Sequence, residues 1–107
     1  MNAAQAGEVQ IVASPDVIDF VRSRGGQVFV WTVAMRYAYG FNVFALEAST
    51  ESPGVDRTFL RFEGEEIALL YDPGDHGTPD EIHLAIVGRV RKQLRAYWNG
   101  KSFASDA

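Results

Sequence analysis

The chain of 107 residues contains no cysteine. This absence excludes disulfides, thiolate metal sites, cysteine-ligated iron–sulfur clusters and cysteine nucleophiles. No apolar run approaches the roughly 20 residues needed to span a bilayer. The first residues, MNAAQAGEVQ, also lack the basic segment and apolar core of a signal peptide. We therefore expect a cytoplasmic protein that has no membrane partner.

Positive charge is in the minority, with ten Lys and Arg against 14 Asp and Glu and a net charge of −4. This balance argues against non-specific nucleic-acid binding over the whole surface. The rest of the composition, 47% hydrophobic and 22% charged, is that of an ordinary globular protein. The length predicts a single domain over residues 1–107, with flexible tails at 1–7 and 104–107.

Residues 14–26, SPDVIDFVRSRGG, predict a helix with signals at both ends. Ser14 can cap the first turn and Pro15 suits the first helical position. Gly25 and Gly26 end the helix, and one of them should adopt a left-handed conformation. Three apolar residues share one face, which we expect to pack on a sheet: Val17, Phe20 and Val21.

Most of the remaining chain predicts strands joined by turns. Residues 27–35, QVFVWTVAM, are apolar at both alternating sets of positions, which indicates a strand covered on both faces. The helix can cover one face, and we expect a second copy of the chain to cover the other, which makes a homodimer. Alternation and turn residues also predict a short strand at 8–13, a strand at 41–49, a hairpin at 58–71 turning at 63–65, and a loop at 72–80.

Residues 81–100 fit both a helix and a pair of strands. Apolar residues recur at helical spacing from Val87 to Trp98, but the even positions from Ile82 to Trp98 are also mostly apolar, as in a strand. Gly88 disfavours one long helix by about 1 kcal/mol relative to alanine and can supply a turn. We favour two strands joined around 88–92, with the helix as the alternative. One helix followed by a run of strands predicts an α+β fold, with the helix on a mostly antiparallel β roll or sandwich.

Three segments carry a resemblance to a known family. YAYGF (37–41), RFEGEEIALLYD (61–72) and WNGKSF (98–103) follow the order of a cysteine loop, a Phe-Glu hairpin and a C-terminal cysteine segment. The chain resembles the A-type iron–sulfur carriers, the HesB-like proteins, over residues 14–103. The resemblance implies a HesB-like roll. The family's cysteines would fall at Ala38 and near Tyr97 and Asn99, so none of them is present to ligate iron.

The function that follows from this resemblance is a non-catalytic accessory or binding domain that has lost iron–sulfur ligation and needs no cofactor. An alternative is a small-molecule-binding protein or a minor enzyme, with a pocket rimmed by Tyr37, Tyr39, His76 and His83. The two tyrosines alternate onto one side of the chain beside Gly40. Together with Phe41 and Trp98 they predict a contact surface for a protein partner or a small apolar ligand; the competing interpretation is core packing.

Four cations within seven residues form the second candidate site: Arg89, Arg91, Lys92 and Arg95. On a hairpin they predict a patch for nucleic acid or for an anionic ligand or partner. The acidic balance of the chain disfavours nucleic acid, and the same charges can simply keep a sheet edge soluble.

The loop that runs into residue 83 collects carboxylates and both histidines of the chain. Asp75, His76 and His83 are the candidates for holding a divalent metal. Their spacing matches no standard metal motif, and aspartates in such a loop commonly accept hydrogen bonds from backbone amides. We therefore predict no metal site here.

Overall fold

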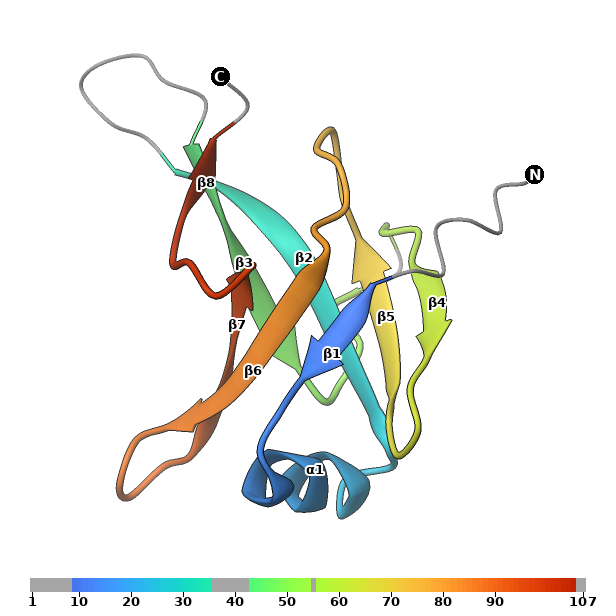
Figure 1. Ribbon diagram of the computed structural model, residues 1–107, viewed down its shortest axis with the longest axis vertical. Helices are drawn as coiled ribbons and strands as arrows, with labels where there is room; N and C mark the ends of the chain where they lie inside the picture. Colours follow the sequence, from blue (N-terminus) through green and yellow to red (C-terminus); the bar gives the residue numbers. More distant parts are fainter. Residues whose placement is uncertain (1–8, 36–42, 55, 106–107) are drawn as a thin grey trace.

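The computed structural model describes residues 9–35, 43–54 and 56–105. They form one short N-terminal helix and an eight-stranded mixed sheet that curls strongly into a half-barrel (Figure 1). The elements are β1 (Gln10–Val12), α1 (Pro15–Arg22), β2 (Gln27–Met35), β3 (Val43–Ser49), β4 (Leu60–Glu63), β5 (Ala68–Asp72), β6 (Glu81–Val87), β7 (Gln93–Trp98) and β8 (Ala104–Ser105).

The strand order across the sheet is β1-β6-β7-β3-β2-β5-β4, and β8 pairs with β3. The β1–β6 and β2–β5 pairs are parallel, and the other pairs are antiparallel. The predicted order of one helix followed by strands is therefore confirmed. The predicted roll or sandwich is a single curled sheet, in which two parallel pairings join strands that are distant in the chain.

The helix α1 begins and ends close to where its sequence signals lie. Ser14 is at the N-cap and its carbonyl accepts the Ile18 N–H at 3.0 Å, but the Ser14 side chain makes no capping hydrogen bond. The prediction of a side-chain cap was therefore wrong. Gly25 and Gly26 both have positive φ, 110° and 80°, and the Gly26 N–H closes the helix end by donating to Val21 at 3.0 Å.

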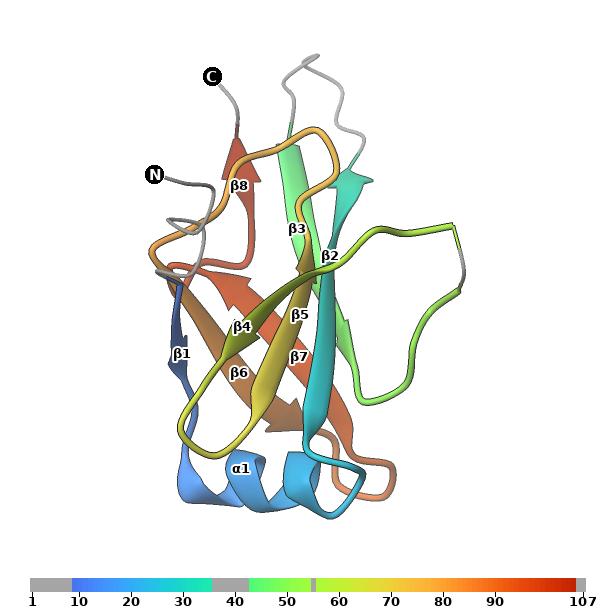
Figure 2. The same cartoon turned by 90° about the vertical axis from the view of Figure 1, so that its right-hand side faces the viewer.

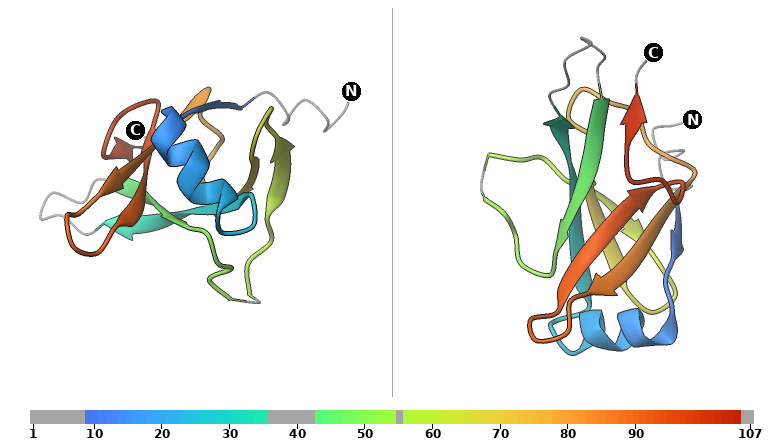
Figure 3. Two further views of the ribbon diagram at one scale, coloured as in Figure 1. Left: turned by 90° about the horizontal axis from the view of Figure 1, so that it is seen from below. Right: turned by 90° about the vertical axis from the view of Figure 1, so that its left-hand side faces the viewer.

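Instead of covering a face of the sheet, α1 lies across one open end of the half-barrel (Figures 1 and 3). Val17 and Val21 are buried and contribute to the core, as the helical pattern predicted. Phe20 is only half-buried. The helix has eight residues, and the described part of the chain holds no helix able to cross a membrane.

The outer face of β2 is packed in part by the chain itself. The Phe59 ring meets Phe29 edge-on with centroids 5.3 Å apart, and the Arg57 guanidinium lies 5.4 Å from the Trp31 ring centroid. Both partners come from the segment between β3 and β4, which runs beside β2 in Figure 2. The doubly apolar pattern of β2 therefore has an explanation within one chain, and it no longer requires a second copy at this face.

Residues 81–98 form an antiparallel hairpin, which confirms the strand interpretation and makes the helical alternative wrong. Ile86 pairs with Leu94, and Val87 pairs with Gln93. Gly88 has a φ of 98°, and a Cβ at this position would lie 2.2 Å from the Arg91 carbonyl oxygen. Only glycine fits this turn, so Gly88 is what separates two strands in a segment whose apolar spacing also suits a helix.

The core fills the interior of the half-barrel. Tyr71 is fully buried, and its hydroxyl donates to the Gly77 carbonyl at 2.9 Å, which fixes the loop after β5. Burial, reinforced by the Asp72 carboxylate, raises the pKa of the Tyr71 phenol, so that the hydroxyl stays protonated and able to donate. The other fully buried large side chains are Phe44, Leu69, Ile82, Val21, Val28 and Val30.

The two tails expected from sequence differ in how far the structure describes them. Ala104 and Ser105 form β8, which pairs with β3 through Phe44 and Val43. Residues 1–7 and 106–107 lie outside the described residues. The hairpin predicted at 58–71 is confirmed as β4 and β5, with the turn spanning 64–67.

Candidate functional site

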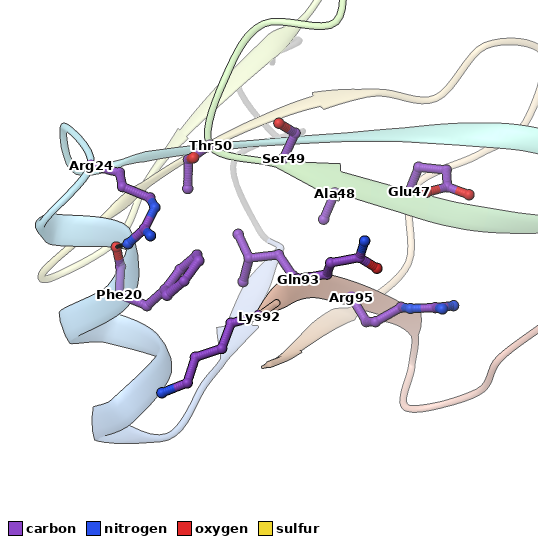
Figure 4. Close-up of a pocket in the computed structure, with 10 residues that line it drawn as sticks. Phe20, Arg24, Glu47, Ala48, Ser49, Thr50, Lys92, Gln93 and Arg95 are labelled. Atoms are coloured by element: carbon purple, nitrogen blue, oxygen red, sulfur yellow. Dashed lines mark hydrogen bonds between the residues drawn. The ribbon is translucent and has the colours of Figure 1, made fainter. Parts of the chain in front are cut away.

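A groove opens between α1, β3 and β7, and we call it the basic groove. It is lined by Phe20, Arg24 and the segments 47–50 and 92–95, and its volume is about 430 Å³. The strands β3 and β7 pair at Leu46 and Ala96, and the groove lies beyond that pair, where the lining segments approach the helix. The topology therefore brings three distant parts of the chain to one surface hollow (Figure 4).

Arg24 is held in place at one end of the basic groove. Its guanidinium carbon lies 3.8 Å from the Phe20 ring centroid. Its Nη1 also donates to the Ser23 hydroxyl at 3.2 Å and to the Phe20 carbonyl at 3.5 Å. A planar guanidinium stacked on a ring loses little further freedom when it binds an anion, because its orientation is already set.

The other cations of the basic groove stand apart from Arg24. In Figure 4 the Lys92 side chain extends beneath Phe20 toward α1, and Arg95 and Glu47 lie at the opposite end from Arg24, on the walls formed by β7 and β3. The hydroxyl residues Ser49 and Thr50 line the wall contributed by β3 and the turn after it. The positive charges therefore follow the length of the groove and do not converge on one point.

The four cations predicted as a patch divide into two pairs. Lys92 and Arg95 line the basic groove, whereas Arg89 and Arg91 are exposed at the turn and do not. Within the described ranges, none of the four forms an ion pair. Arg24 belongs to the site and was missed by sequence reasoning, since nothing in its spacing connects the end of a helix to β7.

A second hollow, of about 650 Å³, lies on the other side of Phe20. Asp16 and Asp19 line it, together with Arg24 and Lys92. These carboxylates make that side unfavourable for an anion, because like charges repel. The wall formed by Ser49 and Thr50 is therefore where a negatively charged group is best accommodated.

The aromatic surface predicted from sequence can be followed only in part. Tyr37, Tyr39 and Phe41 lie outside the described residues. Trp98 is half-buried and meets Phe44 edge-on, with ring centroids 5.0 Å apart. It also lines a cavity of about 420 Å³, whose other lining residues are Val43, Asn99, Lys101, Phe103, Ala104 and Ser105.

The carboxylates and histidines of the loop before β6 are held by separate partners. Asp72 pairs with Arg57 at 3.3 Å and accepts the Gly74 N–H at 2.9 Å, which is the turn role predicted for such aspartates. His83 Nε2 lies 2.7 Å from Glu81 Oε1. The His76 ring stacks on Phe44 with centroids 3.7 Å apart, and Asp75 is exposed.

These positions do not assemble Asp75, His76 and His83 into a metal site. Across residues 9–35, 43–54 and 56–105, no group of three or more His, Asp or Glu side chains is arranged to hold a metal ion. Neither histidine lines the basic groove or the cavity beside Trp98. The pocket that the sequence places between Tyr37, Tyr39 and the histidines stays a prediction, because both tyrosines lie outside the described residues.

Two of the positions matched to cluster cysteines have ordinary structural surroundings. Tyr97 is half-buried on β7. Asn99 has a φ of 49°, its side-chain oxygen accepts the Glu81 N–H at 2.9 Å, and its own N–H donates to the Glu81 carbonyl at 2.9 Å. Asn99 thus fastens the end of β7 to the start of β6. The third position, Ala38, lies outside the described residues.

Comparison of the chain with known protein families, with curated proteins and with solved structures finds no match. The resemblance to A-type iron–sulfur carriers therefore stays a prediction from three sequence segments.

Proposed function

We propose that this protein is a small non-catalytic binding module whose basic groove holds an extended acidic segment of a partner protein. The observation that carries the proposal is the alignment of Arg24, Lys92 and Arg95 along one groove (Figure 4). Cations spaced along a groove suit carboxylates spaced along a peptide, whereas a single small anion needs charges that converge.

The local charge favours such a partner although the whole chain is acidic. Lys92 and Arg95 have no ion-pair partner among the described residues. At physiological salt, charges more than about 8 Å away are largely screened, so the groove presents its own positive potential to a ligand. Arg24 adds a pre-oriented guanidinium at the helix end, and Ser49 and Thr50 add hydroxyl donors.

A protein segment fits the groove better than a nucleic acid does. Glu47 also lines the groove, where it would repel a continuous phosphate backbone, and the net charge of −4 also opposes binding to a polyanion. An acidic peptide can place an uncharged residue opposite Glu47. The groove volume of about 430 Å³ is sufficient for a few side chains of such a peptide.

The experiment is a titration of a labelled peptide in which glutamates alternate with glycines, followed by fluorescence anisotropy at physiological salt, where charges more than about 8 Å apart are largely screened. We expect Arg24→Glu and Lys92→Glu each to weaken binding about tenfold, which corresponds to about 1.4 kcal/mol. Arg89→Glu is the matched control, because it makes the same charge change on the same hairpin without lining the groove. Its effect should stay within about twofold, as a distant screened charge contributes little.

Two results would contradict the proposal. If Arg89→Glu weakens binding as much as Lys92→Glu, the peptide responds to net charge and the groove is not its site. If a labelled single-stranded oligonucleotide of equal charge binds more tightly than the peptide, with affinity that falls steeply as salt rises, the hairpin serves nucleic acid instead.

The proposal keeps the sequence-based expectation of an accessory domain on a HesB-like scaffold without cluster ligands. Support for that scaffold consists of the segments at 37–41, 61–72 and 98–103 alone. It also keeps a second candidate, a small apolar ligand in the cavity of about 420 Å³ beside Trp98, where Val43 and Phe103 supply apolar walls. In a Trp31→Phe background, a shift in Trp98 emission on titration with an aromatic ligand tests this candidate.

A further inference from the structure

The strand β4 ends the sheet. It pairs with β5 through Leu60–Tyr71, Arg61–Leu70, Phe62–Leu69 and Glu63–Ala68. Among the described residues no strand lies on its other side (Figure 2). An exposed strand edge carries unpaired backbone donors and acceptors, which makes it a template for pairing with another strand.

The hydrogen-bond phase of the β4–β5 hairpin identifies which residues face the free edge. Gly64 donates its N–H to the Ile67 carbonyl at 3.0 Å. Residues of an antiparallel pair alternate between exchanging hydrogen bonds and pointing their N–H and C=O groups away. Counting back from Gly64, Phe62 and Leu60 bond to β5, so the backbone groups of Arg61 and Glu63 point outward from the sheet edge.

The same two residues carry opposite charges on the outer face of the strand. Arg61 and Glu63 form an ion pair with each other, and their side chains are 49% and 67% exposed. Phe62, between them, points to the interior and is 3% exposed. Leu60 shares the inner face with Phe62 and is 40% exposed.

We infer that β4 is a dimerisation edge: it pairs antiparallel with β4 of a second copy, about a two-fold axis at Phe62. In this register Arg61 lies opposite Glu63 of the second copy, and Glu63 lies opposite its Arg61. Both residues exchange backbone hydrogen bonds with the other chain, and their side chains form a square of alternating charge. The two curled sheets become continuous across the interface.

Charge complementarity selects both the occupant and the register. Moving the two-fold axis to Arg61 would place two arginines opposite each other, and moving it to Glu63 would place two glutamates opposite each other. Like charges directly opposite on neighbouring strands are destabilising, so only the axis at Phe62 satisfies the pattern. A sequence that reads Arg, Phe, Glu is thus complementary to a second copy of itself.

The strand at the other end of the strand order, β1, has fewer outward-facing backbone groups for pairing with a second copy. Gln10 donates its N–H to the Asp80 carbonyl at 2.9 Å, so Gln10 and Val12 face β6 and only Ile11 turns its backbone outward. It also has no pair of opposite charges. The inferred dimer differs from the one expected at β2, and it leaves the basic groove on α1, β3 and β7 open, so its test is independent of the proposed function.

The test is sedimentation velocity across the micromolar range with charge-reversal variants. The wild type should move toward twice its 11.8 kDa mass as concentration rises. Arg61→Glu and Glu63→Arg should each raise the dissociation constant at least about tenfold, because each turns two attractive cross-strand pairs into repulsive ones. The double variant, Arg61→Glu with Glu63→Arg, exchanges the charges and should associate again.

A mixture of the two single variants gives the sharpest result. One variant presents only carboxylates on β4 and the other only guanidinium groups, so the mixture should form a heterodimer although neither variant associates alone. Glu51→Arg and Lys101→Glu are matched controls, since they make the same charge changes at exposed positions outside β4 and should leave association unchanged.

Amide hydrogen exchange reads out the backbone part of the interface. The amides of Arg61 and Glu63 should exchange slowly in the associated wild type and rapidly in either single variant. A wild type that stays monomeric up to its solubility limit would overturn the inference. So would a mixture of single variants that fails to associate, or slow exchange of both amides in a protein that sediments as a monomer.

Discussion

The hydrogen bond from the Tyr71 hydroxyl to the Gly77 carbonyl predicts how stability responds both to a mutation and to pH. Tyr71→Phe keeps the buried ring and removes only the hydroxyl that donates at 2.9 Å. Gly77 is exposed, so its carbonyl can bond to water in the variant. We therefore expect the free energy of unfolding to fall by about 1 kcal/mol, near the low end for losing a buried hydrogen bond, and Tm to fall by roughly 4–8 °C.

The pH dependence follows from the raised pKa of the Tyr71 phenol. The hydroxyl stays protonated in the folded protein, whereas in the unfolded chain it ionises near pH 10. Below about pH 10 both states are protonated and the contribution of Tyr71 to stability is complete. Above that pH the unfolded state gains stability by ionising, which takes about 1.4 kcal/mol from the wild type at pH 11. The variant has no phenol at this position and escapes that loss.

Urea unfolding followed by circular dichroism at neutral pH and at about pH 11 measures both effects. The free energies of unfolding of wild type and variant should differ by about 1 kcal/mol at neutral pH, and this difference should vanish or reverse at the higher pH. Tyr97→Phe is the control for removing a tyrosine hydroxyl from a half-buried site and should change stability by at most about 0.5 kcal/mol at neutral pH. A gap that is absent at neutral pH, or that stays constant as pH rises, would refute the reasoning.

Two further substitutions test the turns that hold the hairpin β6–β7. Gly88→Ala forces a Cβ to within 2.2 Å of the Arg91 carbonyl oxygen at a φ of 98° and should cost about 1–3 kcal/mol in urea unfolding. Gly77→Ala, where a Cβ meets nothing within 4 Å, is its control and should be nearly neutral; equal losses would show that the turn is not strained. Asn99→Ala removes the acceptor of the Glu81 N–H and a side chain that tolerates a φ of 49°. Thermal unfolding should therefore show a free energy of unfolding lower by about 1–2 kcal/mol. An unchanged free energy would mean that water replaces the side-chain amide.

The sequence predicted the elements of this fold better than their arrangement. Gly88 and the even apolar positions around it identified two strands, because a turn that only glycine fits leaves a local signal. The parallel pairs β1–β6 and β2–β5 leave no such signal, since they join segments far apart in the chain. For the same reason the apolar face of α1 indicated burial but not that the helix closes one end of a half-barrel.

The candidate site shows the same limit. Lys92 and Arg95 were visible as part of a run of cations, but the run itself could not show that these two line a groove while Arg89 and Arg91 are exposed outside it. Arg24 joins them only because the helix end meets β3 and β7 in three dimensions. The outer face of β2 led to the expectation of a second copy there, and the structure shows Phe59 of the same chain against Phe29.

The pairing of β1 with β6 ties the docking of β1 to the synthesis of β6. Gln10 pairs with Glu81, and the helix that follows β1 contacts β6 as well as β2. The strand β1 therefore has no strand partner until the chain has been made as far as β6. Closing so long a loop before its contacts form is slow, so we expect refolding in milliseconds to seconds. Nascent chains that end before β6 should remain sensitive to protease, with β1 undocked.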